Sequence, residues 1–492
     1  MSTIVWFRRD LRLDDHPALT AAVKRGEPVI PVYIHSPNSE EGDAAAGGAT
    51  KWWLHHSLAA LNKELENLGS RLIIRSGTAE AELLDLVKAT KANAVYWHRR
   101  YEPSIIARDT QIKAALKEIG CAAESLNGAL LYEPWTIKNK SGEPYKVYTP
   151  FWRACLAMGA PASPEARVTR LPAPASWPKS LAISKLSLKP TIPWDQGMEA
   201  TWTPGEKGAE AVLNKFLPVA SKYIAERDFP ALPATSQLSS YLALGEISPR
   251  RIWATMASAR AAVKPGEGTG GEAFLRQLGW REFAYHLLYH FPNTVNAPLR
   301  PEFAMFPWES SKSALKAWQR GMTGYPIVDA GMRQLWHTGW MHNRVRMIVG
   351  SFLVKDLLIT WQEGAKWFWD TLVDADLANN TLGWQWIGGC GADAAPYFRV
   401  FNPLGQSEKF DAAGVYLRRW CPELARLPAE WIHRPFEAPK EILSAAGVTL
   451  GKNYPKPLVD HGAARLKALK AFSYLQQDKK KAAAAATTKR KS

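Results

Sequence analysis

Cysteine is scarce in this chain of 492 residues. The few that occur lie far apart, and no two form a Cys-x-x-Cys pair. Their positions are Cys121, Cys155, Cys390 and Cys421. This spacing argues against a structural zinc site and against a disulfide framework, because both need clustered or regularly spaced cysteines. We therefore expect free thiols, most of them buried as small hydrophobic side chains.

Long apolar runs are also missing. Hydrophobic stretches are broken by charge well before the roughly 18 residues that indicate a membrane-spanning helix. The N-terminal residues lead directly into Arg8 and Arg9 without the pattern of a signal peptide. We therefore expect a soluble, intracellular protein with no membrane partner.

Two common site signatures are absent. No Gly-x-Gly-x-x-Gly follows the first predicted strand, which argues against a nicotinamide-type dinucleotide site there. His286 and His290 form a pair at i and i+4, but the residues between them lack the glutamate of a zinc-protease helix. We interpret them as a hydrogen-bonded histidine pair on a helix, and we predict no metal site.

The chain is long and basic. Its length exceeds the usual size of one hydrophobic core, and 46% of its residues are hydrophobic, so two domains are expected. The formal net charge is +16, of which +6 belongs to residues 479–492 and +10 to the rest of the chain. The tail charges are Lys479, Lys480, Lys481, Lys489, Arg490 and Lys491. This excess fits a polyanionic partner, although a solvated basic surface would give the same charge.

The N-terminal part alternates short β-branched runs with helical patterns. The predicted strands are residues 2–7, 29–34, 71–75 and 94–98, and the predicted helices are residues 17–24, 51–68, 79–89 and 105–119. Such alternation is typical of a doubly wound parallel sheet with right-handed crossovers. We therefore predict an α/β domain over residues 1–130.

Prolines crowd the segment after this domain, and helical patterns then dominate. Residues 131–204 are interpreted as a connector, with or without regular structure of its own. Helical patterns at residues 210–216, 249–262, 272–290 and 327–338 indicate a larger all-α domain over residues 205–475. Residues 476–492 are low in complexity and are expected to form a flexible basic tail.

Residues 374–403 are the most informative stretch of the chain. They contain Asp374 and Asp376 at i and i+2, an Asn pair, two tryptophans flanking one glutamine, and a glycine-rich turn. Packing alone does not account for this combination, so we interpret the stretch as a cofactor site. Metal binding by the two aspartates is a rival interpretation, but no third ligand is near them in the sequence.

This stretch resembles the flavin-binding signature of the photolyase/cryptochrome family. Further blocks match the family in order over nearly the whole chain. They are residues 5–13, 235–245, 279–283 and 340–347. The resemblance implies an α/β antenna-binding domain followed by a helical domain that binds FAD and DNA.

The resemblance places FAD in the helical domain. The implied FAD-binding residues are Tyr223, Thr235, Ser236, Gln237, Leu238, Ser239, Arg281, Arg346, Asp374, Ala375, Asp376 and Asn380. Residues 235–239 would hold the pyrophosphate, because hydroxyl and backbone N–H groups at a helix start suit an anion. An ordinary helix N-cap would give the same local pattern. Arg346 would pair with Asp374, since a buried carboxylate is costly without a partner.

The resemblance also gives Asn380 a role in the chemistry, because it matches the residue that faces flavin N5. Its neutral amide can stabilise the reduced ring without readily donating a proton. Plant cryptochromes typically have an aspartate at this position, so Asn380 favours repair over signalling.

An electron-transfer chain is implied as well. Trp384, Trp361 and Trp308 match the tryptophans that lead from the flavin to the surface in the family. Any single one of the 22 tryptophans is more often a core residue, so this assignment depends on the surrounding motifs. Trp367 and Trp369 could form a second branch, which the sequence does not decide.

The implied substrate cavity is aromatic. Trp280 and Trp386 would sandwich a flipped dipyrimidine, with Asn343 and Met347 completing the cavity. Relatives that repair the six-four photoproduct carry histidines where Asn343 and Met347 stand, so that chemistry fits poorly. Arg227, Gln406 and Lys409 match positions at the DNA backbone.

Gln277 departs from the family pattern. Many dimer-repairing members carry a glutamate here, three residues before the cavity tryptophan. The amide of Gln277 can donate a hydrogen bond to a pyrimidine carbonyl but cannot act as an acid. We expect lesion binding to survive this change.

The antenna chromophore is read from two regions. Residues 101–105 match the place where some relatives hold a folate, but Ser104 and Ile105 replace the polar pair of one subgroup. Residues 48–58 and Gly279 are more similar to the photolyases related to plant cryptochromes. We favour methenyltetrahydrofolate over 8-hydroxy-5-deazaflavin.

The resemblance predicts a deoxyribodipyrimidine photo-lyase that repairs cyclobutane pyrimidine dimers by light-driven electron transfer from reduced FAD. It would be a monomer that binds damaged DNA in the cytoplasm, or with the nucleoid if the source is bacterial. One alternative is a cryptochrome-type blue-light receptor that signals through a partner. The other is a flavin-free nucleic-acid-binding protein, which would leave residues 374–386 to packing alone.

Overall fold

The computed structural model describes residues 1–261, 269–394 and 398–489. These residues cluster into two compact units. Unit 1 comprises Met1–Ile224, Ala234–Pro292 and Asp370–Asn379. Unit 2 comprises Ala225–Pro233, Asn293–Trp369 and Asn380–Ser492. Each unit is described by itself.

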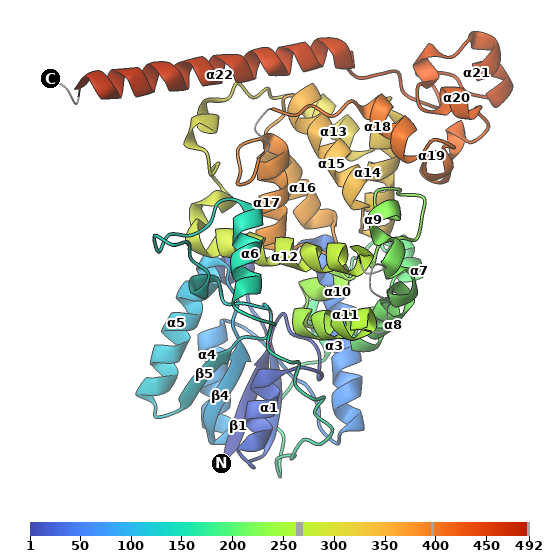
Figure 1. Ribbon diagram of the computed structural model, residues 1–492. Coiled ribbons are helices and arrows are strands. Elements are labelled where there is room, and N and C mark those ends of the chain that lie inside the picture. The colour runs from blue at the N-terminus through green and yellow to red at the C-terminus, as the bar shows by residue number, and fades with distance from the viewer. Residues whose placement is uncertain (262–268, 395–397, 490–492) are drawn as a thin grey trace. The chain divides into compact units, whose positions relative to one another are not determined.

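Unit 1 contains a five-stranded parallel sheet in the order β3-β2-β1-β4-β5 (Figure 1). The strands are β1 (Ser2–Phe7), β2 (Val29–His35), β3 (Ile73–Ser76), β4 (Ala92–His98) and β5 (Ala122–Leu126). All six residues of β1 are buried, as is usual for a central parallel strand covered on both faces. From β1 the chain adds β2 and β3 on one side of the sheet, and it then returns to add β4 and β5 on the other side of β1. The topological switch point therefore lies between β1 and β4.

Helices cover the sheet and continue through the rest of unit 1. They are α1 (Pro17–Lys24), α2 (Asn38–Glu41), α3 (Gly48–Asn67), α4 (Ala79–Thr90), α5 (Pro103–Glu118), α6 (Tyr148–Ala157), α7 (Gln196–Thr201), α8 (Glu206–Phe216), α10 (Ser239–Ala243), α11 (Pro249–Ala261) and α12 (Thr269–His290). One core joins Ile4 and Trp6 of β1 to Leu83 and Leu86 of α4. Phe7 packs on His16 beside α1 instead, because successive side chains of a strand alternate between its faces.

Unit 2 is helical, apart from an isolated bridge between Leu450 and Tyr454 in its described part. Its helices are α13 (Lys312–Gln319), α14 (Pro326–Thr338), α15 (Asn343–Ser351), α16 (Trp361–Thr371), α17 (Leu377–Gly388), α18 (Pro403–Phe410), α19 (Val415–Trp420), α20 (Ala429–Ile432), α21 (Lys440–Ala446) and α22 (His461–Lys489). The boundary between the units falls within three helices: the short α9 (Tyr223–Glu226), the end of α16 and the start of α17.

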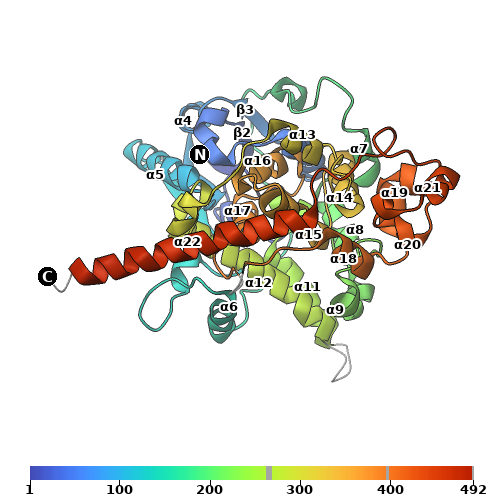
Figure 2. The same cartoon turned by 90° about the horizontal axis from the view of Figure 1, so that it is seen from above.

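Local sequence explains where several of these helices begin and end. Pro326 opens α14 and Gly339 follows it with φ 68°, so proline and glycine occupy the positions where each is favoured. The side chain of His342 accepts a hydrogen bond from the backbone N–H of Arg344 and caps α15. After α15, the π-helical turn Phe352–Asp356 leads toward α16, and α22 packs along this turn (Figure 2).

The predicted fold class is confirmed. The predicted strands and helices of the N-terminal part all form, with ends shifted by a few residues. The prediction missed β5, an edge strand whose Ala-Ala-Glu-Ser-Leu sequence carries no β-branched residue and is mostly not buried. All four cysteines are buried and free. Residue 262, the last of one predicted helix, lies outside the described residues.

The C-terminal tail differs from its prediction. Residues 476–489 continue α22 instead of forming a flexible segment. Low complexity was taken as a sign of disorder, but alanine and lysine are strong helix formers. Among the described helices, none has both the length and the apolar composition that a membrane crossing requires.

Candidate functional site

Residues 235–239 form a turn that leads into α10 in unit 1. Gln237 has φ 55°, a left-handed conformation that is uncommon for a residue with a side chain. Leu238 follows with φ −68° and ψ −13°, in the right-handed helical region. Successive residues of opposite hand turn their backbone N–H groups to the same side, which makes a concave nest for an anion. The Ser236 hydroxyl accepts from the N–H of Leu238 at 3.3 Å.

The two aspartates of residues 374–376 are held by hydrogen-bond donors. The Ser239 hydroxyl donates to Asp374 Oδ2 at 2.7 Å, which joins the acidic pair to the turn. Asp376 accepts from Asn379, at 2.9 Å from its backbone N–H and 2.7 Å from its side-chain amide. The Tyr285 hydroxyl donates to the other oxygen of Asp376. Both oxygens of Asp376 therefore accept hydrogen bonds from protein groups.

Tyr223 and Arg281 have different surroundings. Tyr223 is buried, and its ring packs edge to face on Phe216 and Phe274, with ring centroids 5.8 and 5.6 Å away. Arg281 donates to the Ala129 carbonyl at 2.7 Å, and its guanidinium carbon lies 4.8 Å from the ring centroid of Tyr285.

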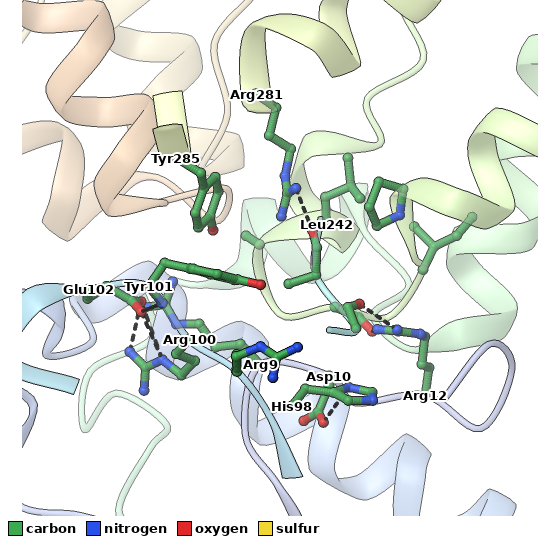
Figure 3. A pocket seen from close by; sticks show the side chains of 17 residues that line it. Arg9, Asp10, Arg12, His98, Arg100, Tyr101, Glu102, Leu242, Arg281 and Tyr285 are labelled. Atoms are coloured by element: carbon green, nitrogen blue, oxygen red, sulfur yellow. Dashed lines mark hydrogen bonds and ion pairs between the residues drawn. The ribbon is translucent and has the colours of Figure 1, made fainter. Parts of the chain in front are cut away.

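An open pocket lies beyond the carboxyl ends of β1 and β4 (Figure 3), and its volume of about 490 Å³ includes space that is open to solvent. This is the topological switch point, where parallel α/β sheets commonly bind ligands. Arg281 and Tyr285 from α12 face Tyr101 and Arg9 from the strand ends. The rings of Tyr101 and Tyr285 meet edge to face with their centroids 5.8 Å apart.

Charge in this pocket is largely fixed. Glu102 and Arg100 form an ion pair at 2.9 Å. Burial alone would raise the pKa of Glu102, but Arg100 and Arg9 lower it to about 2. The pocket therefore presents arginines and aromatic rings, a combination suited to an anionic aromatic ligand.

Asp10, His16 and His98 form a buried cluster below this pocket. His16 Nε2 and His98 Nδ1 approach Asp10 Oδ2 at 3.1 and 2.9 Å. The remaining ring nitrogens accept hydrogen bonds from the backbone N–H groups of Leu19 and Ala18. Each histidine therefore carries its proton on the nitrogen that faces Asp10, the reverse of a metal-bound histidine, whose second nitrogen is a donor.

The two histidines instead stabilise the buried charge of Asp10. Burial lowers the pKa of His98 to about 3, with His16 as the second cause. Burial would raise the pKa of Asp10, but hydrogen bonds from the two histidines hold it well below its usual value. The result is a buried Asp10 carboxylate that accepts hydrogen bonds from both imidazoles.

Trp280 lies flat against Tyr148. Their ring centroids are 3.8 Å apart and their planes differ by 8°. The Tyr148 hydroxyl donates to the Arg276 carbonyl at 2.8 Å, which fixes the tyrosine on α12. Gly279 permits this close packing of α6 on α12, because a Cβ there would lie 2.7 Å from both Trp152 and Tyr148. Gln277, one turn earlier, donates to the Ala273 carbonyl at 3.1 Å.

The predicted tryptophan chain lies in unit 2. Trp384 and Trp361 are each 2% exposed, and Trp308 is partly exposed. Trp384 packs edge to face on Phe368 at 4.9 Å, and Gly364 makes room for it. Burial thus decreases from Trp384 toward Trp308, as a path from the interior to the surface requires.

Other tryptophans approach this chain. Trp318 is fully buried, with its ring centroid 6.2 Å from that of Trp384. Trp367 stacks on Trp336, with centroids 6.0 Å apart and planes within 7°, and Trp336 is 55% exposed.

Further predicted residues also lie in unit 2. Arg346 donates to the Met341 carbonyl at 2.7 Å, and Asn380 donates to the Ala365 carbonyl at 3.1 Å. Asn343 and Met347 are neighbours on α15, with the amide nitrogen 3.9 Å from the sulfur.

The remaining substrate positions of unit 2 are accessible to differing degrees. Arg227 lies 3.8 Å from Asp228, and its side chain is 24% exposed. Trp386 is partly exposed on α17, and Gln406 lies on α18. Lys409, on the same helix, lies 5.2 Å from the ring centroid of Phe410.

Comparison with known proteins shows which family this chain belongs to. Residues 3–175 match the family described as DNA photolyase, and residues 274–474 match the FAD binding domain of DNA photolyase. A deoxyribodipyrimidine photo-lyase from Agrobacterium fabrum is 52% identical over 96% of this chain and 98% of its own. The chain belongs to the photolyase/cryptochrome family.

Two further relatives come from the two branches of this family, one a cryptochrome and one a photolyase. Cryptochrome-2 of Arabidopsis thaliana is 42% identical over 96% of this chain and 78% of its own. The crystal structure of a bacterial class III photolyase from Agrobacterium tumefaciens superposes with a TM-score of 0.92 at 51% identity. That comparison covers 97% of this chain and 98% of the other.

The nest at Gln237 and Leu238 fits the pyrophosphate of FAD. Its donors are backbone N–H groups and the hydroxyls of Thr235, Ser236 and Ser239, a set that suits a phosphate and not a metal. In this structure the Leu238 N–H donates to Ser236 and the Ser239 hydroxyl donates to Asp374. The strained conformation of Gln237 is itself a mark of function, because such strain persists where the surroundings enforce it.

Sequence reasoning missed several residues of these groups. Tyr285 holds Asp376, and its one signal was the i, i+4 spacing from Arg281. Tyr148 supports Trp280, and Trp318 contacts Trp384. Nothing local in the sequence marks either contact, because each joins segments that are far apart along the chain.

Proposed function

We propose that this member of the family is a DNA photolyase that repairs cyclobutane pyrimidine dimers. The observation that carries the proposal is the stack of Trp280 on Tyr148, which offers a flat, fixed aromatic surface to a flipped base. Asn343 and Met347, where six-four enzymes have histidines, support the dimer as substrate. The 52% identity to a deoxyribodipyrimidine photo-lyase is consistent with it.

FAD is the proposed redox cofactor, and its reduced form supplies light-driven one-electron transfer to the dimer. In unit 1, the nest at residues 235–239 binds phosphate oxygens, with Tyr223 and Arg281 as the further predicted phosphate residues. The backbone of Ala375 and the side chains of Asp374 and Asp376 line the ring system.

In unit 2, Arg346 and Asn380 are the proposed FAD residues. The amide of Asn380 is oriented by the Ala365 carbonyl, so it presents a neutral polar group that does not readily release a proton. Arg346 adds a positively charged side chain to these residues.

Lesion recognition is proposed for the aromatic and amide residues. Trp280 stacks on one base of the dimer, and Trp386 lines the cavity with Asn343 and Met347. Gln277 donates a hydrogen bond to a pyrimidine carbonyl. Arg227, Gln406 and Lys409 contact the DNA backbone, where phosphate contacts fix register without reading sequence.

The tryptophans Trp384, Trp361 and Trp308 are proposed to resupply electrons when the cofactor is oxidised. Trp384 and Trp361 are equally buried and Trp308 is partly exposed, which supports Trp308 as the member at the surface. A second route is supported by the contact of Trp318 with Trp384 and by the stacked pair Trp367 and Trp336.

The pocket at the switch point is the proposed antenna site. It includes Tyr101 and Glu102 of the region that resembles a folate site, and its arginines suit the glutamate carboxylates of methenyltetrahydrofolate. The folate remains our preference over 8-hydroxy-5-deazaflavin. Residues 1–130 are accordingly proposed as the antenna domain, 131–204 as connector, 205–475 as the FAD- and DNA-binding domain and 476–492 as a basic tail. A cytoplasmic monomer is proposed.

The alternative is a cryptochrome-type blue-light receptor that signals through a partner. The 42% identity to Cryptochrome-2 of Arabidopsis thaliana favours it. Trp280 and Asn380 argue against it.

One experiment separates the two functions. The purified protein is reduced chemically, mixed with DNA containing thymine dimers and illuminated with blue light, and the dimers are counted by chromatography. Photolyase activity predicts loss of dimers in the light and none in the dark. A protein that binds reduced FAD and leaves the dimers intact would contradict repair and favour the receptor.

A further inference from the structure

A lysine is buried beside the tryptophan chain, and none of the steps above uses it. Lys355 is 1% exposed and lies on the π-helical turn Phe352–Asp356. Leu358, just after the turn, has φ 51°, a left-handed conformation that costs free energy for a leucine. Irregular helical turns of this kind are frequent at functional sites.

The surroundings of Lys355 contain no counter-ion. Its Nζ donates to the Gly388 carbonyl at 3.0 Å and lies 3.0 Å from the ring centroid of Phe398. Within the described residues, no carboxylate approaches it closely enough for an ion pair. Burial lowers the pKa of Lys355 well below its usual value.

The same surroundings can nevertheless accommodate an ammonium. The Phe398 ring offers its face to the nitrogen, and aromatic faces attract cations. Gly388 is the last residue of α17, and carbonyls at a helix C-terminus also favour a positive charge. Lys355 is therefore placed to exist in either charge state.

The residue whose carbonyl accepts from Lys355 lies near Trp361. A Cβ added to Gly388 would lie 3.7 Å from Cδ1 of Trp361, the ring carbon bonded to the indole nitrogen. The carbonyl that receives the hydrogen bond from Lys355 thus belongs to a residue in contact with this tryptophan.

Other contacts lead from Lys355 to Trp308. The ring of Phe398, under the amine, lies 5.8 Å from Phe306, and Phe306 lies 4.5 Å from Trp308. The carbonyl of Leu358 also accepts from the N–H of Glu309, next to Trp308, at 2.8 Å. Lys355 is thus connected by contacts to both outer members of the chain.

We propose that the charge state of Lys355 controls the entry of an electron hole into the outer part of the tryptophan chain, Trp361 and Trp308. This inference rests on the proposed tryptophan chain. A tryptophan that has given up an electron carries a positive charge. A neutral amine leaves that state undisturbed, whereas an ammonium nearby opposes it, since charges interact strongly in a poorly solvated interior.

The other titratable groups here are neutral or paired. Burial raises the pKa of the Cys390 thiol to about 12, so it remains uncharged. Arg300, which donates to the Gly389 carbonyl at 3.0 Å, is paired with Glu302 at 3.1 Å. Asp356, next to Lys355, faces His461 at 2.5 Å. A change of charge on Lys355 is therefore not offset by its neighbours.

Two substitutions test the proposal in the FAD-loaded protein. Lys355→Met keeps the length of the side chain and removes the charge, and Lys355→Arg makes the charge permanent. Lys366→Met, at a lysine of α16 that is 76% exposed, is the matched control. Hole transfer is followed by transient absorption of the oxidised tryptophans after a laser flash, from pH 5 to pH 9.

In the parent, transfer should slow as the pH falls and Lys355 takes up a proton, because a lowered pKa means that the charged form appears on the acid side. Lys355→Met should be fast at every pH. Lys355→Arg should be slow throughout, by roughly tenfold or more, because a buried unit charge is weakly screened. Lys366→Met should behave like the parent.

A second measurement reads the lysine itself without light. The chemical shift of ¹³C-labelled Lys355 Cε, assigned by its loss in Lys355→Met, should report a neutral amine at neutral pH. An ammonium there, or equal pH profiles for the parent and Lys355→Met, would overturn the proposal even if Lys355→Arg fails to fold. If the flash kinetics are as expected but no dimers are repaired, only the repair function is rejected. If dimers are repaired but the parent and Lys355→Met have equal pH profiles of hole transfer, only the role of Lys355 is rejected.

Discussion

At the scale of single residues, Trp384 is the sharpest test of the electron path. Replacement by phenylalanine removes an indole that gives up an electron readily, so light should no longer reduce oxidised FAD. Repair by the chemically reduced protein should persist, because the electron returns from the split dimer. Absorption at 450 nm under illumination measures the first and dimer counts the second.

Trp52→Phe is the matched control for this test, since Trp52 is equally buried but lies in unit 1. Undiminished photoreduction in Trp384→Phe would show that the path starts elsewhere. The contact with Trp318 makes that residue the next to replace.

Gln277 belongs to the same scale. If its amide donates to a pyrimidine carbonyl, Gln277→Leu leaves a buried acceptor unpaired and should weaken dimer binding by about 1–3 kcal/mol. Gln277→Glu should retain repair or improve it, because a protonated carboxyl is also a donor. Binding of dimer-containing oligonucleotides and repair per absorbed photon measure both variants. Equal binding by the parent and the leucine variant would remove Gln277 from the lesion contacts.

The candidate site residues were easier to predict from the sequence than the residues that hold them in place. Asp374, Asp376 and residues 235–239 stood out in the sequence, and the structure joins them through the Ser239 hydroxyl. The supports, Tyr148 under Trp280 and Tyr285 at Asp376, depend on contacts between distant segments. Local composition carries no record of such contacts, so the prediction could not include them.

At the scale of elements, the close packing of α6 on α12 depends on Gly279. Gly279→Ala would place a methyl group 2.7 Å from Trp152 and Tyr148, so the helices must separate. We expect a loss of about 1–3 kcal/mol of unfolding free energy, as for other overpacked cores. The preference for damaged DNA should fall too, because Trp280 loses its support.

Gly271→Ala on the same helix is the control, since its new methyl would meet only Met256 at 3.6 Å, an ordinary contact. Urea denaturation and competition binding with undamaged DNA measure the two effects. A normal lesion preference in a destabilised Gly279→Ala protein would separate the helix packing from recognition.

The helix α12 also carries a pH-sensitive contact. His286 accepts from the N–H of Tyr145 at 3.0 Å, and its other ring nitrogen faces the Pro134 carbonyl at 3.3 Å. Burial lowers the pKa of His286 to about 4. Because the unfolded chain then binds the proton more tightly, the stabilisation is present above about pH 6.5 and is lost as the pH falls through about 4.

His286→Gln offers the same donor and acceptor without a titrating group. The parent should lose up to about 3 kcal/mol relative to this variant between pH 7 and pH 4. Urea denaturation at several pH values gives the difference. A difference that does not change with pH would mean that the histidine is charged in the folded state.

Elements were predictable where their sequence pattern was strong. The buried strands β1 and β2 and the helix α1 were found because apolar runs and proline mark them. The edge strand β5 and the π-helical turn at Lys355 were missed. The first gains its conformation from pairing with β4, and the second from tertiary packing, so neither has a local signature.

At the scale of the whole molecule, the net charge of +16 predicts how DNA binding depends on salt. Deleting residues 479–492 removes +6 of it. The buried anchors of α22, Ala468, Ala471 and Leu475, remain, so the fold should persist. Affinity for undamaged DNA should fall, and so should its dependence on salt, because fewer counterions are released.

Lesion preference should be unchanged in this truncated protein, since the tail reads no base. Titrations of damaged and undamaged oligonucleotides between 50 and 300 mM salt test both statements. An unchanged salt slope would place the DNA contacts entirely on the body of the protein.

The parallel rings of Tyr148 and Trp280 are separated by about the spacing of neighbouring bases in a duplex. The protein therefore carries a short piece of stacked column that ends at an indole. A pyrimidine that flips out of the duplex and docks on Trp280, as proposed, exchanges stacking on its neighbouring bases for stacking on the indole. The aromatic pair that receives it is already ordered in the folded chain. What remains to be lost on docking is the freedom of the DNA alone, so flexibility of the damaged strand should govern the rate of capture.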